Sequence, residues 1–132
     1  MAGTVTASIV KNDTTSPPQF QNSAGTQIGT LCRAWVQFDT STGTIPSGGS
    51  FNVGSVTRSS AGQYTVNFAN PFADANYAVT VGYSLRGIGN SANSVASYVS
   101  FNAGSISLQQ VLTAPSGGTA YDQGAMCVSV FR

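Results

Sequence analysis

The side chains able to do chemistry in this chain are few and of limited kinds. Its 132 residues include no histidine, no glutamate and a single lysine. The other charges are four arginines and four aspartates, the latter being Asp13, Asp39, Asp74 and Asp122. Histidine and glutamate supply most of the groups that change protonation near neutral pH, so acid–base catalysis lacks its usual residues. We therefore expect a non-enzymatic protein, built to fold, assemble and present a surface.

One enzyme class stays open, a glycan hydrolase that uses two aspartates. It would need two carboxyl groups about 5–9 Å apart in an open cleft. Each aspartate instead sits in turn-like sequence, which predicts that it caps a turn. Asp74 and Asn76 offer oxygens to calcium, but a calcium site usually takes several carboxylates from one loop. We expect no metal and no cofactor.

Length and composition indicate one folded domain rich in turns. The hydrophobic fraction is 41%, and glycine occurs 15 times. A net charge of +1 without a basic run offers no footprint for nucleic acid. No apolar stretch approaches the roughly 18 residues of a transmembrane helix, and the first residues lack the pattern of a signal peptide. We expect neither nucleic-acid binding nor membrane insertion.

Two-residue alternation of apolar and polar side chains predicts antiparallel β-structure. It is clearest in residues 32–39, 63–68, 77–83, 105–113 and 126–131, and residues 51–57 alternate until a phase slip at Gly54 that indicates a bulge. The short link 58–62 predicts that residues 51–57 and 63–68 pair as a hairpin. We expect a single antiparallel β-sandwich or jelly-roll-like domain of about seven or eight strands over residues 31–132.

The alternation also predicts the core. It places Tyr64 and Tyr77 among the valines of their strands. The apolar residues expected inside are Val36, Phe38, Phe51, Val53, Val66, Phe68, Val79, Val81, Ile106, Leu108, Val128 and Val130.

Residues 1–30 differ from the rest and predict an extended N-terminal arm for assembly or anchoring. Residues 4–10 could form a strand, but the segment 11–18 (KNDTTSPP) interrupts it, and Pro-Pro favours an extended chain. A segment with so few apolar residues buries little against its own domain, so we favour contact with another subunit. The residues assigned to this arm are Asn12, Asp13, Pro17, Pro18, Phe20 and Ile28.

Cys32, Cys127 and Trp35 allow more than one interpretation. The cysteines are expected to be small buried hydrophobes, with a disulfide between them as the alternative. Without histidine, zinc is nearly excluded. Trp35 faces away from Val36, which predicts a second apolar layer or a trimer contact; an aromatic platform for a sugar is the alternative.

Four spaced segments carry a resemblance to a known group of proteins. They are residues 32–38 (CRAWVQF), 50–56 (SFNVGSV), 62–68 (GQYTVNF) and 74–77 (DANY). Together they resemble a module of tailed-bacteriophage virion proteins described as tail-fibre-like. This chain departs from that pattern at residues 43–49, where many relatives carry a basic residue, and at Gln63, where aspartate is common.

The resemblance implies a structural virion protein, assembled in the host cytoplasm and exposed on the particle. It implies a homo-oligomer, usually a trimer, that contacts other virion proteins of the tail, baseplate or capsid. A tail-fibre-like module would also bind a glycan or a protein of the host surface. The alternative is a capsid cement or decoration protein that bridges capsomers. The short chain, which begins at Met1 without a shaft, favours that alternative, whereas the resemblance favours the tail.

Loops held by a rigid β-scaffold are the usual place for contact residues, and residues 86–93 look the most exposed. An uninvolved surface loop is the competing interpretation. The candidate surface-contact residues are Arg86, Ile88, Asn90, Asn93, Tyr98 and Tyr121. Arg33 is expected to pair with an aspartate across strands or subunits, which would stabilise by only about 0–1 kcal/mol.

Overall fold

The computed structural model describes residues 20–83, 93–113, 119–122 and 124–132. The chain divides into two compact units, residues 1–30 and 31–132. Asn12, Asp13, Pro17 and Pro18 of the expected arm lie outside the described residues, as does the expected strand over residues 4–10.

In the first unit, the described residues form a small antiparallel hairpin. It pairs β1 (Phe20–Gln21) with β2 (Gln27–Gly29). The side-chain oxygen of Asn22 accepts the N–H groups of Ala24 and Thr26 at 3.0 and 2.9 Å, and this fixes the turn. Phe20 and Ile28 are 50% and 69% exposed. A two-stranded hairpin without a core is marginally stable alone, so these two side chains lack burial within the described part of the unit.

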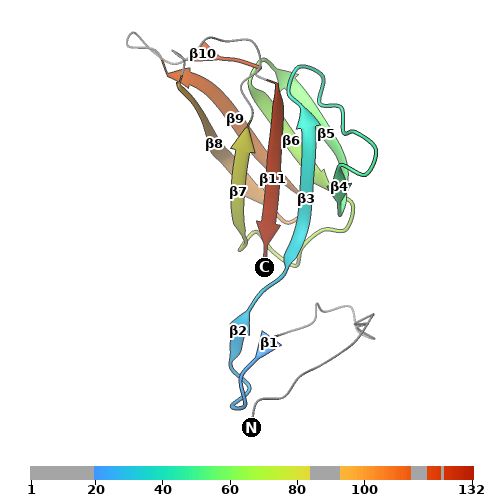
Figure 1. The fold of residues 1–132 in the computed structure, drawn as a ribbon, viewed down its shortest axis with the longest axis vertical. Coiled ribbons are helices and arrows are strands. Elements are labelled where there is room, and N and C mark those ends of the chain that lie inside the picture. The colour runs from blue at the N-terminus through green and yellow to red at the C-terminus, as the bar shows by residue number, and fades with distance from the viewer. Residues whose placement is uncertain (1–19, 84–92, 114–118, 123) are drawn as a thin grey trace. The chain divides into compact units, whose positions relative to one another are not determined.

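The second unit is a β-sandwich, as the alternation predicts. Its first sheet has four strands in the order β4-β3-β11-β7, all antiparallel. The strands are β3 (Cys32–Asp39), β4 (Ser50–Phe51), β7 (Ala78–Tyr83) and β11 (Ala125–Phe131). Figure 1 shows β7, β11 and β3 side by side in this layer.

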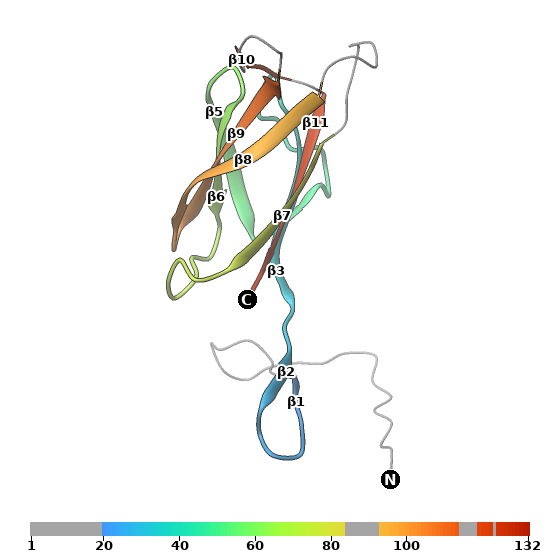
Figure 2. The same cartoon turned by 90° about the vertical axis from the view of Figure 1, so that its left-hand side faces the viewer.

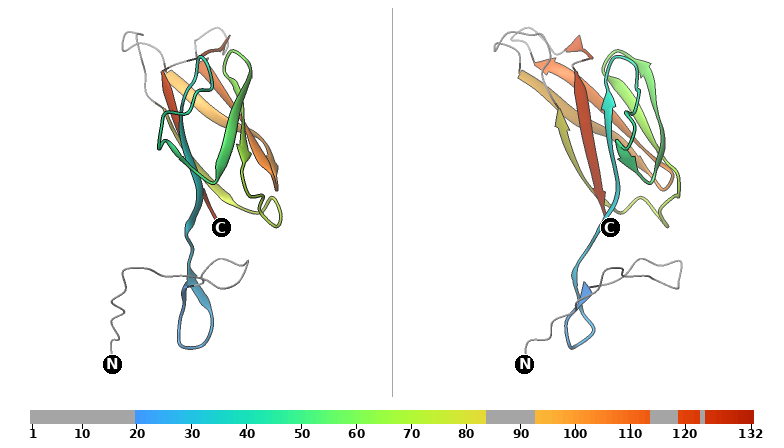
Figure 3. Two further views of the ribbon diagram at one scale, coloured as in Figure 1. Left: turned by 90° about the vertical axis from the view of Figure 1, so that its right-hand side faces the viewer. Right: turned by 45° about the vertical axis from the view of Figure 1, so that its right-hand side comes forward.

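The second sheet has five antiparallel strands. β9 lies at its centre, with β8 on one side and β6 and β10 on the other, and β5 follows β6. The strands are β5 (Val53–Ser60), β6 (Gln63–Phe68), β8 (Asn93–Asn102), β9 (Ser105–Thr113) and β10 (Thr119–Ala120). Figures 2 and 3 show the two layers from the sides. The described residues contain no helix, and so none that could cross a membrane.

The two sheets enclose an apolar core. Eight of the twelve predicted core residues are buried, and Val53, Val79 and Val81 pack against them partly buried. Tyr64 is buried as expected, and Tyr77 is partly buried, with its hydroxyl donating to the carbonyls of Asn102 and Ser105 at 3.1 Å. Ala34, Phe72 and Met126 join the core although the predicted core omitted them.

Phe51 is the one predicted core residue that lies outside, because its segment changes sheets. The alternating run 51–57 is broken at Asn52, which has a positive φ of 53°. Residues before it pair with β3, and residues after it pair with β6 in the other sheet. The Asn52 side chain holds this crossing by donating to the carbonyls of Arg33 and Asn70 at 3.2 and 3.1 Å. Phe51 is consequently 56% exposed.

The β5–β6 hairpin confirms the predicted pairing and the predicted bulge. The register shifts between Val53 and Ser55, on either side of Gly54, and the strands turn just before Gln63. Gly62 in this turn has a φ of +69°. A Cβ on Gly62 would lie 2.4 Å from the Gln110 carbonyl oxygen and 2.6 Å from the Tyr121 nitrogen. Both are backbone atoms, so they cannot move aside cheaply.

We predict that Gly62→Ala lowers the free energy of unfolding by about 2–4 kcal/mol, because the clash adds to the strain of the left-handed backbone. The measurement is urea unfolding at neutral pH. Gly82→Ala is the matched control, since a Cβ there meets nothing within 4 Å. Similar midpoints for the two variants would contradict the prediction.

Gln110 is an exception within the core. It is fully buried on β9, and its side-chain nitrogen and oxygen find no hydrogen-bond partner in the described part of the chain. A buried amide without partners loses its hydration without compensation.

Gln110→Leu should therefore raise the free energy of unfolding by about 1 kcal/mol. Thermal unfolding followed by circular dichroism measures this change. Leu108→Gln, at the preceding inward position of β9, should do the reverse and destabilise strongly. A loss of stability in Gln110→Leu would show that the amide is satisfied in solution.

Candidate functional site

The described aspartates show what the carboxylates of this chain do. Asp39 and Asp74 cap turns as predicted, by accepting the N–H of Ser41 at 2.8 Å and that of Asn76 at 2.7 Å. Asp74 also forms an ion pair with Arg132, whose Nη2 lies 2.7 Å from Oδ2. The hydrogen bonds from Arg132 and Asn76 lower the pKa of Asp74 to about 2.

Within the described residues, Asp122 accepts no hydrogen bond from its own turn, contrary to the prediction of a turn cap. It accepts hydrogen bonds from three distant groups: the Arg58 guanidinium, with Nε at 2.9 Å, the Gly62 N–H at 2.9 Å and the Tyr64 hydroxyl at 2.5 Å. Burial opposes the ionisation of Asp122, but these donors outweigh it and hold its pKa below the usual value. Burial and the bond to Asp122 together raise the pKa of Tyr64. The sequence offered no local signal for this, because the partners lie about sixty positions away.

These bonds leave the described carboxylates in structural roles. The described residues contain no group of three or more histidine, cysteine or acidic side chains that could hold a metal. Arg33 forms no ion pair with the described aspartates; its guanidinium carbon lies 5.8 Å from the centre of the Phe72 ring. The bonds of Asp74 and Asp122 tie together segments that are distant in the chain.

The cysteines also differ from the expectation of buried side chains. Cys127 is exposed, Cys32 is partly buried, and both are free thiols. Cys127 pairs with Gln37, whereas Cys32 pairs with Phe131, four positions further along β11. The two cysteines are therefore roughly 13 Å apart along the sheet, too far for the alternative disulfide.

The predicted contact residues are placed only in part. Arg86, Ile88 and Asn90 lie outside the described residues, and so do the side chains of Asn93 and Tyr98 on β8. Tyr121 is 42% exposed, and its role in contact stays a prediction.

The outer face of the four-stranded sheet is the better defined candidate surface. Trp35 projects from it, as the alternation of β3 predicts, and is 38% exposed. Its cross-strand neighbour on β4 is the exposed Phe51, and its neighbour on β11 is Ser129. Two large aromatic side chains therefore stand next to each other on a rigid sheet, without a core to cover them.

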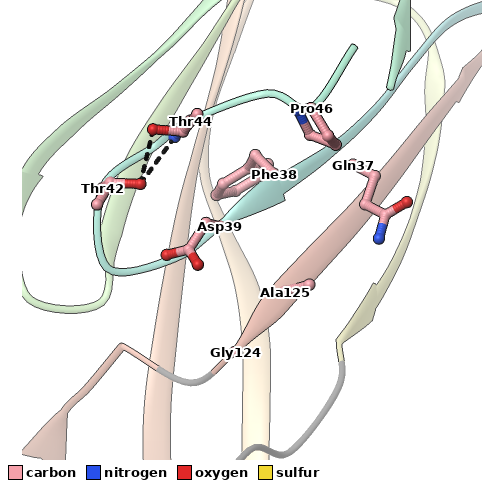
Figure 4. Close-up of a pocket in the computed structure, with 8 residues that line it drawn as sticks. All are labelled: Gln37, Phe38, Asp39, Thr42, Thr44, Pro46, Gly124 and Ala125. Carbon is pink, nitrogen blue, oxygen red and sulfur yellow. Dashed lines mark hydrogen bonds between the residues drawn. The ribbon is translucent and has the colours of Figure 1, made fainter. Parts of the chain in front are cut away.

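An open pocket of about 340 Å³ lies further along the same strand. Figure 4 shows Gln37 and Asp39 on β3, Thr42, Thr44 and Pro46 on the loop that follows, and Ala125 at the start of β11. Gln37 is exposed and follows Trp35 by two positions, so the two side chains share the outer face. Sequence analysis missed the pocket, because its loop meets a strand that begins more than eighty residues later.

The threonines in the pocket wall hold each other in place. The Thr42 hydroxyl donates to Thr44 Oγ1 at 2.8 Å and accepts the Thr44 N–H at 3.1 Å. The backbone supports the loop, since the N–H of Asp39 donates to the Thr44 carbonyl at 2.9 Å. The lining thus offers hydroxyl, amide and carboxylate groups, and the threonine hydroxyls are held in place. Such a site can bind a ligand through hydrogen bonds.

The carboxylate bonds predict how stability depends on pH. Asp74 and Asp122 have folded pKa values below the unfolded value of about 3.9, so their contribution is present above that pH and is lost as the pH falls through the folded values. We expect a nearly constant free energy of unfolding between about pH 5 and 8, because the chain has no histidine and no glutamate, and a decline from about pH 4 towards 2.

Asp122→Asn should lower the free energy of unfolding at pH 7 by about 1–3 kcal/mol and weaken the acid-induced decline. Urea unfolding across this pH range measures both effects. Asp39→Asn, which alters an exposed turn, is the control and should change stability by less than about 1 kcal/mol. An unchanged acid decline in Asp122→Asn would contradict the prediction.

Comparison with known proteins finds no match for this chain. No protein-family model, curated protein or solved structure is similar to it. Support for a function therefore comes from its residues and their geometry.

Proposed function

We propose that this protein is a non-enzymatic structural component of a tailed-phage virion, of the tail-fibre-like kind. It assembles as a homo-oligomer, a trimer by the resemblance, and presents a β-sandwich on the particle surface for contact with the host. The observation that carries the proposal is the exposed Trp35–Phe51 pair on a sheet with few charges. A large exposed aromatic pair on a rigid element is typical of a contact surface.

Two further features favour binding over catalysis. Asp74 and Asp122 are held by arginines, and Asp39 accepts hydrogen bonds from Ser41 in a turn. A glycan hydrolase needs one carboxyl group with a raised pKa to act as the acid. The pKa values of Asp74 and Asp122 are lowered instead.

The hairpin of the first unit supports the assembly part of the proposal. Phe20 and Ile28 expose apolar area that gains free energy when covered, at about 25 cal/mol per Å². In this proposal a neighbouring subunit covers them.

Light scattering of the purified full chain should therefore show an oligomer, with a trimer as the expected size. The double variant Phe20→Ser/Ile28→Ser should shift it towards monomer, because the apolar contact is lost. Gln27→Ser, in the same hairpin, is the control and should keep the oligomer. A wild-type monomer at micromolar concentration would contradict the assembly proposal.

Electron microscopy of intact phage particles decorated with an antibody against this chain tests where on the particle the chain lies. Labelling at the tail is the expected result. Labelling at the three-fold positions of the capsid would replace the tail-fibre-like role with the decoration role, and particles without the chain would overturn the virion proposal.

A further inference from the structure

We propose that the pocket over β3 and β11, together with Trp35, is a binding site for an uncharged saccharide. The inference rests on the proposed surface-presenting role and assigns a ligand class to the face described above. It places recognition on the four-stranded sheet rather than on the loop 86–93.

The polar groups of the pocket match the chemistry of a sugar ring. A sugar hydroxyl both donates and accepts hydrogen bonds, and so do the Gln37 amide and the threonine hydroxyls. The Asp39 carboxylate adds a strong acceptor. Thr42 and Thr44 are already tied to each other, so little side-chain freedom is lost when a ligand binds them.

Trp35 supplies the apolar half of the site. It precedes Gln37 by two positions on one strand, so their Cα atoms are about 6.6 Å apart on the same face. A pyranose ring has an apolar C–H face and a polar rim. A sugar ring that lies on Trp35 would bury its C–H face against the indole and turn its polar rim towards Gln37.

Size and charge argue against other ligand classes. The volume of about 340 Å³ is near the lower end of ligand pockets, which run from about 300 to 1,000 Å³. Among the described lining residues, Asp39 is the charged one and none is a cation, so these residues would repel a phosphate, sulfate or acidic sugar. A wholly apolar ligand would strip water from Gln37 and Asp39 without replacing their hydrogen bonds.

Trp35 is the only tryptophan of the chain, so its fluorescence reports directly on this face. The full chain is titrated with a panel of neutral oligosaccharides built from glucose, galactose, mannose or N-acetylglucosamine. At least one should change the emission of Trp35 with saturation at millimolar concentration or below. Isothermal titration calorimetry then measures the affinity for that oligosaccharide.

Three variants locate the site. Gln37→Ala and Thr44→Val should each weaken that affinity at least about fivefold, since a lost hydrogen bond is worth about 1 kcal/mol. Trp35→Ala should weaken it at least about tenfold, by calorimetry. Gln63→Ala, an exposed glutamine on a strand of the other sheet, is the control and should leave the affinity unchanged.

Several outcomes would overturn the proposal. One is an unchanged emission throughout the panel at about 10 mM, ten times the Kd of about 1 mM that a shallow site can reach. Another is equal affinity in Gln37→Ala and wild type. A third is that Trp35→Ala changes the oligomer size, since the face would then be an interface between copies. Each is distinguishable from failure of the virion proposal, which antibody labelling of particles decides separately.

Discussion

The rest of the second unit depends on the hydrogen bonds that converge on Asp122. This carboxylate joins the corner after β10 to the β5–β6 hairpin, through Arg58, the Gly62 N–H and the Tyr64 hydroxyl. The phenol of Tyr64 is buried. Without an acceptor, its hydroxyl would lose its hydrogen bonds to water and gain none within the protein. Two residues later, the Gly124 carbonyl accepts both the N–H and the hydroxyl of Thr40, at 2.9 and 3.1 Å. The two bonds of Thr40 thus position the start of β11 against the loop that walls the pocket.

The elements set by local alternation could be predicted from the sequence. The expected bounds of β3, β6 and β9 agree with the structure, because each of these strands turns one apolar face to a single core. The prediction from alternation was wrong at Phe51. The apolar–polar pattern continues through this segment, although the chain passes there from one sheet to the other. Two-residue alternation indicates which residues of a strand share a face, but it does not indicate to which sheet the strand belongs. That choice is made by Asn52, whose side chain binds backbone from two separate segments.

The candidate site was only half predictable, for a related physical reason. The outward direction of Trp35 follows from the period of one strand, and it was correctly read. The pocket beside it depends on contacts between residues far apart in the chain, such as Asp39 with Ala125, which are paired in the β3–β11 ladder. The role of Asp122 was missed on the same ground, since an Asp in a turn-like segment resembles any other turn cap until its distant partners are known. Local chemistry identifies candidate groups, but topology decides which of them meet.

The scarcity of charge also has a structural meaning. Asp74 holds the C-terminal Arg132 and Asp122 holds Arg58, so on the described outer face the Asp39 carboxylate stands among aromatic, amide and hydroxyl groups. Contacts of that kind change little with ionic strength, because salt screens charges and not dispersion or neutral hydrogen bonds. They also change little between about pH 5 and 8, where no histidine titrates. In the proposed role, a face built in this way would recognise its partner by shape and hydrogen bonding, and such recognition would suit a surface that meets solutions of varying composition.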